Sequence, residues 1–304
     1  MKKGNKGVVI VIVLAFTAAI SVMAMFLSVR AKEYISVFSG AQRNNEMENL
    51  AEMGIRMGKV LLDTTQTRHI ITEVPGYIQK QYEIDGREIE ITIEDESGKI
   101  NPNIIFGPGR GEVNTRLLEV YKRFFSVMGY PTRLSDALLD WIDEDDIPRV
   151  EGAESIFYRT AGFAYTVPNR ALYTPAEIIL VSGFTEEIVF GDDETKGLIN
   201  FITSFSNGKI NVNTCQLEVL NALGFSGENI DKIIAERERR PVEEKFMLEV
   251  NKEAYLKYRA IIVFKSNYFA ITSRVIDAEG YKKEARAYVL RTDKSMDTVK
   301  MEMK

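Results

Sequence analysis

Acidic side chains crowd a short stretch of the sequence, and their spacing could bind a cation. Four carboxylates fall at relative positions 1, 3, 9 and 12 of this stretch, namely Asp143, Asp145, Glu151 and Glu154. Calcium takes about six to eight oxygen ligands, and carboxylates at such intervals along a loop supply them. The stretch is not an EF-hand, because Ile147 and Pro148 stand where that motif needs an oxygen ligand and a glycine. We expect calcium to bind here.

Other interpretations of these carboxylates remain open. A solvated acidic helix end is the simplest, but clustered acids near a helix C-terminus oppose the helix dipole and so favour a bound cation. A catalytic magnesium site would need a phosphate-binding glycine loop beside it, and the sequence offers none there. Paired carboxylates for glycoside hydrolysis are a further option, yet nothing else in the sequence marks a sugar cleft.

The remaining reactive side chains argue against an enzyme. The chain of 304 residues has one cysteine, Cys215, and one histidine, His69. A single cysteine excludes an intramolecular disulfide and a cysteine-based zinc site, and a single histidine weakens any Ser-His-Asp triad. The net charge is −5, and the first 30 residues carry basic charges alone, which leaves the rest more acidic still. We therefore expect no catalytic residue and no nucleic-acid partner.

An uncharged segment near the N-terminus is long enough to span a membrane. Residues 8–29 form a run of 22 without a charge, roughly 33 Å as a helix. Lysines precede this run and acidic residues follow it, which predicts a cytoplasmic N-terminus and an exported remainder. A plain signal anchor, or a signal peptide removed after Ala24, is the alternative.

The helical pattern continues beyond the membrane segment. Apolar or small residues recur every three or four positions from residue 30 to residue 64, and no proline interrupts them. One continuous helix is therefore predicted from the membrane to about Leu62. Its first half is apolar and its second half is amphipathic.

Two hairpins with alternating apolar residues flank a long helical region. In the first, Tyr82 and Ile84 precede an Asp85-Gly86 turn of type I′, and isoleucines alternate with polar residues after it. The second hairpin alternates in the same way around a turn at residues 279–280. The residues between the hairpins, 112–265, are predicted as helices with short links. The fold class is therefore α+β, with a sheet interrupted by a helical insertion.

A repeat lies within this region. The line GKINPN at 98–103 returns as GKINVN at 208–213, and each is followed by a helix, a Gly-aromatic turn and a second helix. Two helical hairpins are predicted, similar to SAM-like or helix-hairpin-helix modules. In helix-hairpin-helix modules, amides of a glycine turn contact DNA phosphate, so a membrane-tethered DNA receptor is an alternative function. The second turn, Gly-Phe-Ser-Gly, is longer than is usual for that module and carries no basic residue.

The basic leader, which ends in Gly7 at the apolar boundary, and the long helix after it resemble the N-terminus of type IV pilins and pseudopilins. In that family a prepilin peptidase cuts after the glycine, which implies cleavage between Gly7 and Val8 and methylation of the new N-terminus. Most pilins carry glutamate at the fifth position after the cut, whereas this chain has Ile12. An unpaired carboxylate in a bilayer is costly, so a subunit that needs no such pairing has reason to lack it.

Motifs along almost the whole chain are similar to those of the K subunit of the type II (general) secretion pathway, a family of minor pseudopilins. They include both GKIN lines, the segment WIDEDD with the GAE after it, VPNRALYTPAEIILVSG and a late ITSRV strand. The resemblance implies a non-enzymatic subunit at the pseudopilus tip, which primes assembly and supports protein export. It implies calcium at Asp143, Asp145 and Glu154, whereas Glu151 is argued from spacing alone.

The implied partners are the I and J minor pseudopilins, the major pseudopilin and the prepilin peptidase. The implied location is the bacterial inner membrane, crossed once, with the soluble part exported. The chain then divides into a leader at 1–7, a transmembrane helix at 8–29 and its amphipathic continuation at 30–64. A pilin-like sheet follows at 65–111 and 266–291, interrupted by the helical insertion at 112–265, and a charged, poorly ordered tail closes the chain at 292–304.

Overall fold

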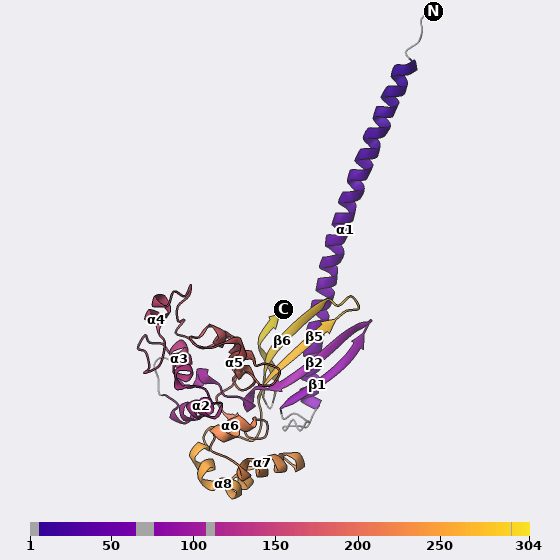
Figure 1. Cartoon of the computed structure of the whole chain (residues 1–304). Coiled ribbons are helices and arrows are strands. Elements are labelled where there is room, and N and C mark those ends of the chain that lie inside the picture. The colour runs from indigo at the N-terminus through magenta and orange to yellow at the C-terminus, as the bar shows by residue number, and fades with distance from the viewer. Residues whose placement is uncertain (1–5, 65–75, 108–112, 293) are drawn as a thin grey trace, which may run out of the picture.

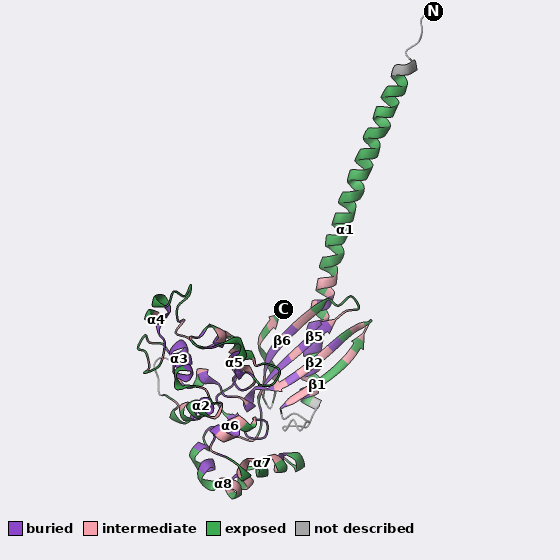
Figure 2. Cartoon of the chain, in the orientation of Figure 1, coloured by how far each residue is buried: buried purple, intermediate pink, exposed green. Residues whose placement is uncertain are grey.

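The computed structural model describes residues 6–64, 76–107, 113–292 and 294–304. A single helix of 59 residues, α1 (Lys6–Thr64), begins the described chain and projects far beyond the rest of the molecule (Figure 1). From Val9 onward its projecting part is exposed, and it is apolar enough to cross a membrane (Figure 2). The prediction of one unbroken helix to about Leu62 is confirmed.

The sheet has five antiparallel strands in the order β1-β2-β5-β6-β7. The strands are β1 (Tyr77–Ile84), β2 (Arg87–Asp95), β5 (Tyr268–Ile276), β6 (Lys282–Arg291) and β7 (Met296–Met303). Asp85 and Gly86 both have positive φ, at 51° and 72°, as a two-residue type I′ hairpin turn requires. Strands distant in sequence, β2 and β5, pair directly at the centre of this sheet.

The second half of α1 covers one face of the sheet. The buried residues of this half of α1 pack against isoleucines of β2 and β5 and against small residues of β6. These helix residues are Met47, Ala51, Ile55 and Leu62. Two glycines allow the close approach. A Cβ on Gly54 would lie 2.0 Å from Ser273 Oγ, and one on Gly58 would lie 2.5 Å from Ile271 Cγ2. The amphipathic pattern of residues 30–64 thus matches burial only in its later part.

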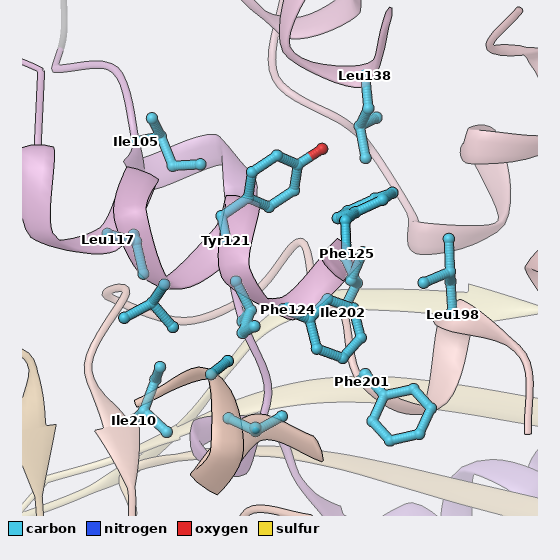
Figure 3. Close-up of a cluster of buried hydrophobic side chains, with 14 of the residues drawn as sticks. Ile105, Leu117, Tyr121, Phe124, Phe125, Leu138, Leu198, Phe201, Ile202 and Ile210 are labelled. Carbon is cyan, nitrogen blue, oxygen red and sulfur yellow. The ribbon is translucent and has the colours of Figure 1, made fainter. Parts of the chain in front are cut away.

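The insertion lies beside the sheet, at the end of the molecule away from the N-terminus of α1 (Figure 1). Its helices are α2 (Thr115–Val127), α3 (Thr132–Ile142), α4 (Ser155–Thr160), α5 (Glu186–Phe190), α6 (Leu217–Ala222), α7 (Glu228–Arg239) and α8 (Glu244–Tyr258). A parallel pair of two-residue strands, β3 (Ile210–Asn211) and β4 (Ile262–Val263), connects the middle of the insertion to its C-terminal end. Aromatic side chains of α2, notably Phe124 and Phe125, lie within a second hydrophobic core (Figure 3).

Polar contacts connect the insertion to the sheet. The buried carboxylate of Asp95, at the end of β2, accepts hydrogen bonds from the hydroxyls of Thr214 and Ser266. On the sheet face opposite α1, the ring of Phe205 packs against Tyr268 and Tyr288 at centroid distances of 5.4 and 5.3 Å. The insertion therefore packs directly against the sheet, both at the end of β2 and on the sheet face opposite α1.

The C-terminal segment differs from the prediction of a poorly ordered tail at 292–304. Residues Met296–Met303 form β7, which pairs with β6 along the edge of the sheet. The charges that suggested disorder alternate with apolar residues, so the segment has the period of two that a strand at a sheet edge requires. A turn in which the Thr292 amide donates to the Ser295 carbonyl starts the strand.

Candidate metal centre

Three buried carboxylates converge where α3 ends and α4 begins. Asp140, Asp143 and Glu154 are 0%, 6% and 3% exposed, and one oxygen from each lies within 4.8 Å of the others. Asp140 stands in the last turn of α3, and Asp143 caps that helix through its amide, which donates to the Leu139 carbonyl at 3.1 Å. Glu154 is the N-cap residue of α4, but its side chain does not cap the helix. It turns toward the two aspartates instead.

The loop between the helices returns an arginine to the same place. Nη1 of Arg149 lies 2.5 Å from Asp140 Oδ1 and 2.5 Å from Asp143 Oδ2, and the Arg149 amide also donates to Asp140. Gly152 lets the loop pass close to Asp140, since a Cβ there would lie 1.8 Å from Asp140 Oδ2. The guanidinium lies over the ring of Phe106, 5.2 Å from its centroid. One positive charge is therefore built into the cluster.

Several oxygens at this place are buried without a hydrogen-bond partner among the described residues. They are Asp143 Oδ1, both carboxylate oxygens of Glu154, and the side-chain oxygen of Asn169. Asn169 reaches the loop from a later segment, where its amide nitrogen donates to the Asp145 carbonyl at 2.8 Å. Buried acceptors without partners are costly, and a hard cation held by the carboxylates would satisfy those of Asp143 and Glu154 together.

The protonation of Glu154 reflects the crowding. Burial, together with the nearby charges of Asp140 and Asp143, raises its pKa from 4.5 to about 8. Burial also raises the pKa of Asp140 and of Asp143, although the hydrogen bonds and charge of Arg149 act in the opposite direction. The cluster resists full ionisation unless additional positive charge arrives.

The structure unites only part of the carboxylate set that the sequence spacing proposed. Asp143 and Glu154 lie in the cluster. Asp145 is half-buried beside it and accepts the Ile147 amide at 2.8 Å, while Glu151 is exposed. Asp140 was missed, although it lies one helical turn before Asp143 and so projects from the same face of α3. The identity of the ligands stays a prediction, with Asp140 added to it.

Two other predicted sites lie away from this cluster. Residues 1–5 of the leader lie outside the described residues, and the surroundings of Gly7 and Val8 at the predicted cleavage point are likewise not described. In the second helical hairpin, Arg237 is buried and donates to the Val212 and Cys215 carbonyls at 2.7 and 2.9 Å. That arginine is committed to packing, which removes a basic group that a DNA-binding hairpin would use.

Comparison with known proteins agrees with this architecture. A family model described as "Type II secretion system (T2SS), protein K" matches residues 98–190, a segment that includes the three carboxylates. The type II secretion system protein K of Pseudomonas aeruginosa is 24% identical over 239 residues, which cover 73% of this chain and 69% of that protein. The protein K of Klebsiella pneumoniae is 23% identical over 239 residues, or 71% and 68% of the two chains.

A solved structure has the same fold. The match is a chain in the crystal structure of the GspK-GspI-GspJ complex of the type 2 secretion system from enterotoxigenic Escherichia coli. It has a TM-score of 0.63 at 16% identity, covering 90% of this chain and 99% of that one. The long helix, the interrupted antiparallel sheet and the helical insertion are thus those of a K protein. With the sequence matches, they make this chain similar to the K proteins of type II secretion, which are non-enzymatic minor pseudopilins.

Proposed function

We propose that this protein caps a type II secretion pseudopilus as the outermost subunit of a complex with I-like and J-like minor pseudopilins. The insertion lies at the end of the molecule away from the projecting half of α1 (Figure 1). If the apolar half of α1 is held in the inner membrane with the rest exported, the insertion points away from the membrane. A bulky domain there obstructs a further subunit above it. This position of the insertion is the observation that carries the proposal.

Ile12 supports the same role. In a filament core built from such helices, the amino terminus of each incoming subunit needs a carboxylate opposite it. A subunit at the tip has no neighbour beyond it and can carry an apolar residue at that position. The matching crystal structure is named as a complex of K with I and J proteins, which favours those two as the partners below.

Affinity purification of the full chain from detergent-solubilised membranes tests this proposal. We expect the I-like and J-like pseudopilins to copurify with it in near-equal amounts, and the major pseudopilin in far smaller amounts. The mature chain should start at Val8, as mass spectrometry of the N-terminus would show. Copurification with the major pseudopilin alone would contradict a capping role.

We further infer that the insertion contains two equivalent SAM-like units, each opened by one GKIN line. Asn101 and Asn211 both accept the amide of the residue two positions on. Asn103 and Asn213 both accept a backbone amide from a later segment and donate to backbone carbonyls there. Their partners are Leu172 and Ser204 in the first unit, and Val242 and Phe264 in the second. The acidic loop belongs to the first unit only.

Calcium is the cation that we propose for the cluster. Asp140, Asp143 and Glu154 would hold it, and the side-chain oxygen of Asn169 is a fourth donor. Oxygen donors from carboxylates and an amide, without histidine or cysteine, suit a hard divalent ion. Its charge would secure the junction of α3 and α4 within the capping domain. Asp145 and Glu151 remain proposed ligands from the sequence spacing, although Glu151 is exposed.

Isothermal titration of the full chain with calcium tests this site. We expect binding to be lost in Asp143→Asn and retained in Glu151→Gln, which changes an exposed acid of the same loop. Loss of binding in Glu151→Gln alone would restore the ligand set predicted from spacing. Absence of binding in the unsubstituted chain would return the cluster to a structural role.

A further inference from the structure

Arg149 is the charged group that distinguishes this cluster from a plain set of acids. Its Nη1 bridges Asp140 Oδ1 and Asp143 Oδ2, so that both aspartates are fixed by one cation. The bridge leaves other oxygens of the cluster available: Asp143 Oδ1 and both oxygens of Glu154 have no partner among the described residues. Arg149 therefore neutralises part of the charge and does not fill the place where the unpartnered oxygens lie.

The remaining charge is two. Three buried carboxylates contribute three negative charges when ionised, and Arg149 offsets one of them. Two neighbouring acids, Asp145 and Asp146, also raise the pKa of Glu154, but they are half-buried and exposed and so are screened by water. Two other basic groups of the insertion form ion pairs elsewhere: Lys122 with Asp136, and Arg170 with Glu177.

We propose that Arg149 sets the charge selectivity of this metal site, making it a site for divalent ions and disfavouring trivalent ones. This inference rests on the proposed cation binding at the cluster. Arg149 acts as a positioning residue, because it touches the carboxylates and not the ion. It repels any ion in the site, and the repulsion scales with the charge of that ion. Removing the guanidinium charge therefore favours a trivalent ion more than a divalent one.

The substitution that isolates this effect is Arg149→Gln, which removes the charge and keeps a polar side chain. Arg149→Lys keeps the charge, and a single ammonium can bridge two carboxylates as the single nitrogen Nη1 does here. Arg159→Gln is the matched control for the loss of an arginine nearby. Arg159 is exposed on α4 and donates to the Ser155 carbonyl.

Terbium and calcium are the probes, applied to the full-length chain in detergent. The one tryptophan of the chain, Trp141, is adjacent to Asp140 in sequence and can sensitise terbium luminescence. Terbium titration gives one dissociation constant, and displacement by calcium gives the other. The measured quantity is the ratio of the two. Any cost of folding in a variant enters both constants alike and cancels in the ratio.

We expect the preference for terbium over calcium to rise by about tenfold or more in Arg149→Gln, from the removal of one unit charge a few ångströms away. The ratio should be unchanged in Arg149→Lys and in Arg159→Gln. An unchanged ratio in Arg149→Gln, with both ions still bound, would overturn the role of Arg149 and leave the metal site standing. Failure of the unsubstituted chain to bind either ion would overturn the metal site and this inference together.

Discussion

Glu154→Gln should change the stability of the protein in opposite directions with and without calcium. Glutamine has nearly the same shape as glutamate but cannot ionise, so the variant isolates the charge of this side chain. In the folded chain without metal, the pKa of Glu154 is raised from 4.5 to about 8. The carboxyl group is therefore mostly protonated at pH 7 when folded and ionised when unfolded.

The sign and size of the effect follow from this difference. A group whose pKa is raised by folding contributes stability that is fully present below its unfolded pKa and is lost as pH rises through the folded pKa. Between pH 4.5 and pH 7 the metal-free protein should lose about 3 kcal/mol through Glu154, at about 1.4 kcal/mol per pH unit. Glu154→Gln removes this loss. Without metal at pH 7, the variant should be more stable than the unsubstituted chain by up to this amount.

With calcium, the unsubstituted chain should be more stable than Glu154→Gln. An ion bound to the folded state stabilises it by RT ln(1 + [L]/Kd), about 2.7 kcal/mol at a hundredfold excess over Kd. The unsubstituted chain should gain this stability, and the gain should increase from pH 5 to pH 8 because calcium must displace the proton from Glu154. Glu154→Gln should gain little.

Thermal melts of both chains, with calcium and with chelator at several pH values, make the comparison. Glu151→Gln serves as the control, since it removes a charge from the exposed part of the same loop and should follow the unsubstituted chain. If Glu154→Gln is less stable than the unsubstituted chain in chelator at pH 7, or if calcium stabilises both equally, the reasoning about Glu154 is refuted.

Two further predictions concern close contacts. Gly152→Ala should abolish most of the stabilisation by calcium, because its Cβ would lie 1.8 Å from Asp140 Oδ2; calorimetric titration checks this, and unchanged binding would contradict it. Gly54→Ala should destabilise the chain by about 1–3 kcal/mol through overpacking against Ser273, as measured by denaturant unfolding. Adding Ser273→Gly should recover part of that loss, and equal instability of single and double variants would contradict the packing explanation.

The sequence was sufficient to predict the long helix α1 and both hairpins, because their signals are local. The short links expected at 112–265 were wrong in part, since long irregular stretches separate α4 from α5 and α5 from α6. The dipeptide Asp85-Gly86 between two alternating segments is a strong signal for a hairpin turn. The regular recurrence of apolar residues without a proline predicts α1. A further exception was β7, where charged residues suggested a disordered tail. Strand formation there depends on pairing with β6, and pairing with a partner strand is not visible in the composition of one segment.

The metal centre was predictable only in outline. Spacing along a loop identified Asp143 and Glu154, which the chain brings together where two helices meet. Asp140 was overlooked because it lies inside a helix, outside the loop numbering. Arg149 and Asn169 could not be inferred from spacing, since their roles depend on how the loop returns and on a segment more than twenty residues later. The folded path of the chain places both side chains, and that path is not visible in the spacing of residues along the sequence.

The position of this protein along assembled pseudopili tests the capping role most directly. Filaments assembled in cells would carry a small label on the insertion, at an exposed residue such as Glu186 on α5, and would be imaged by electron microscopy with gold. We expect one label at the distal end of each filament and none along the shaft. Labels distributed along the shaft would contradict the capping role, although the likeness of the chain to K proteins would be unaffected.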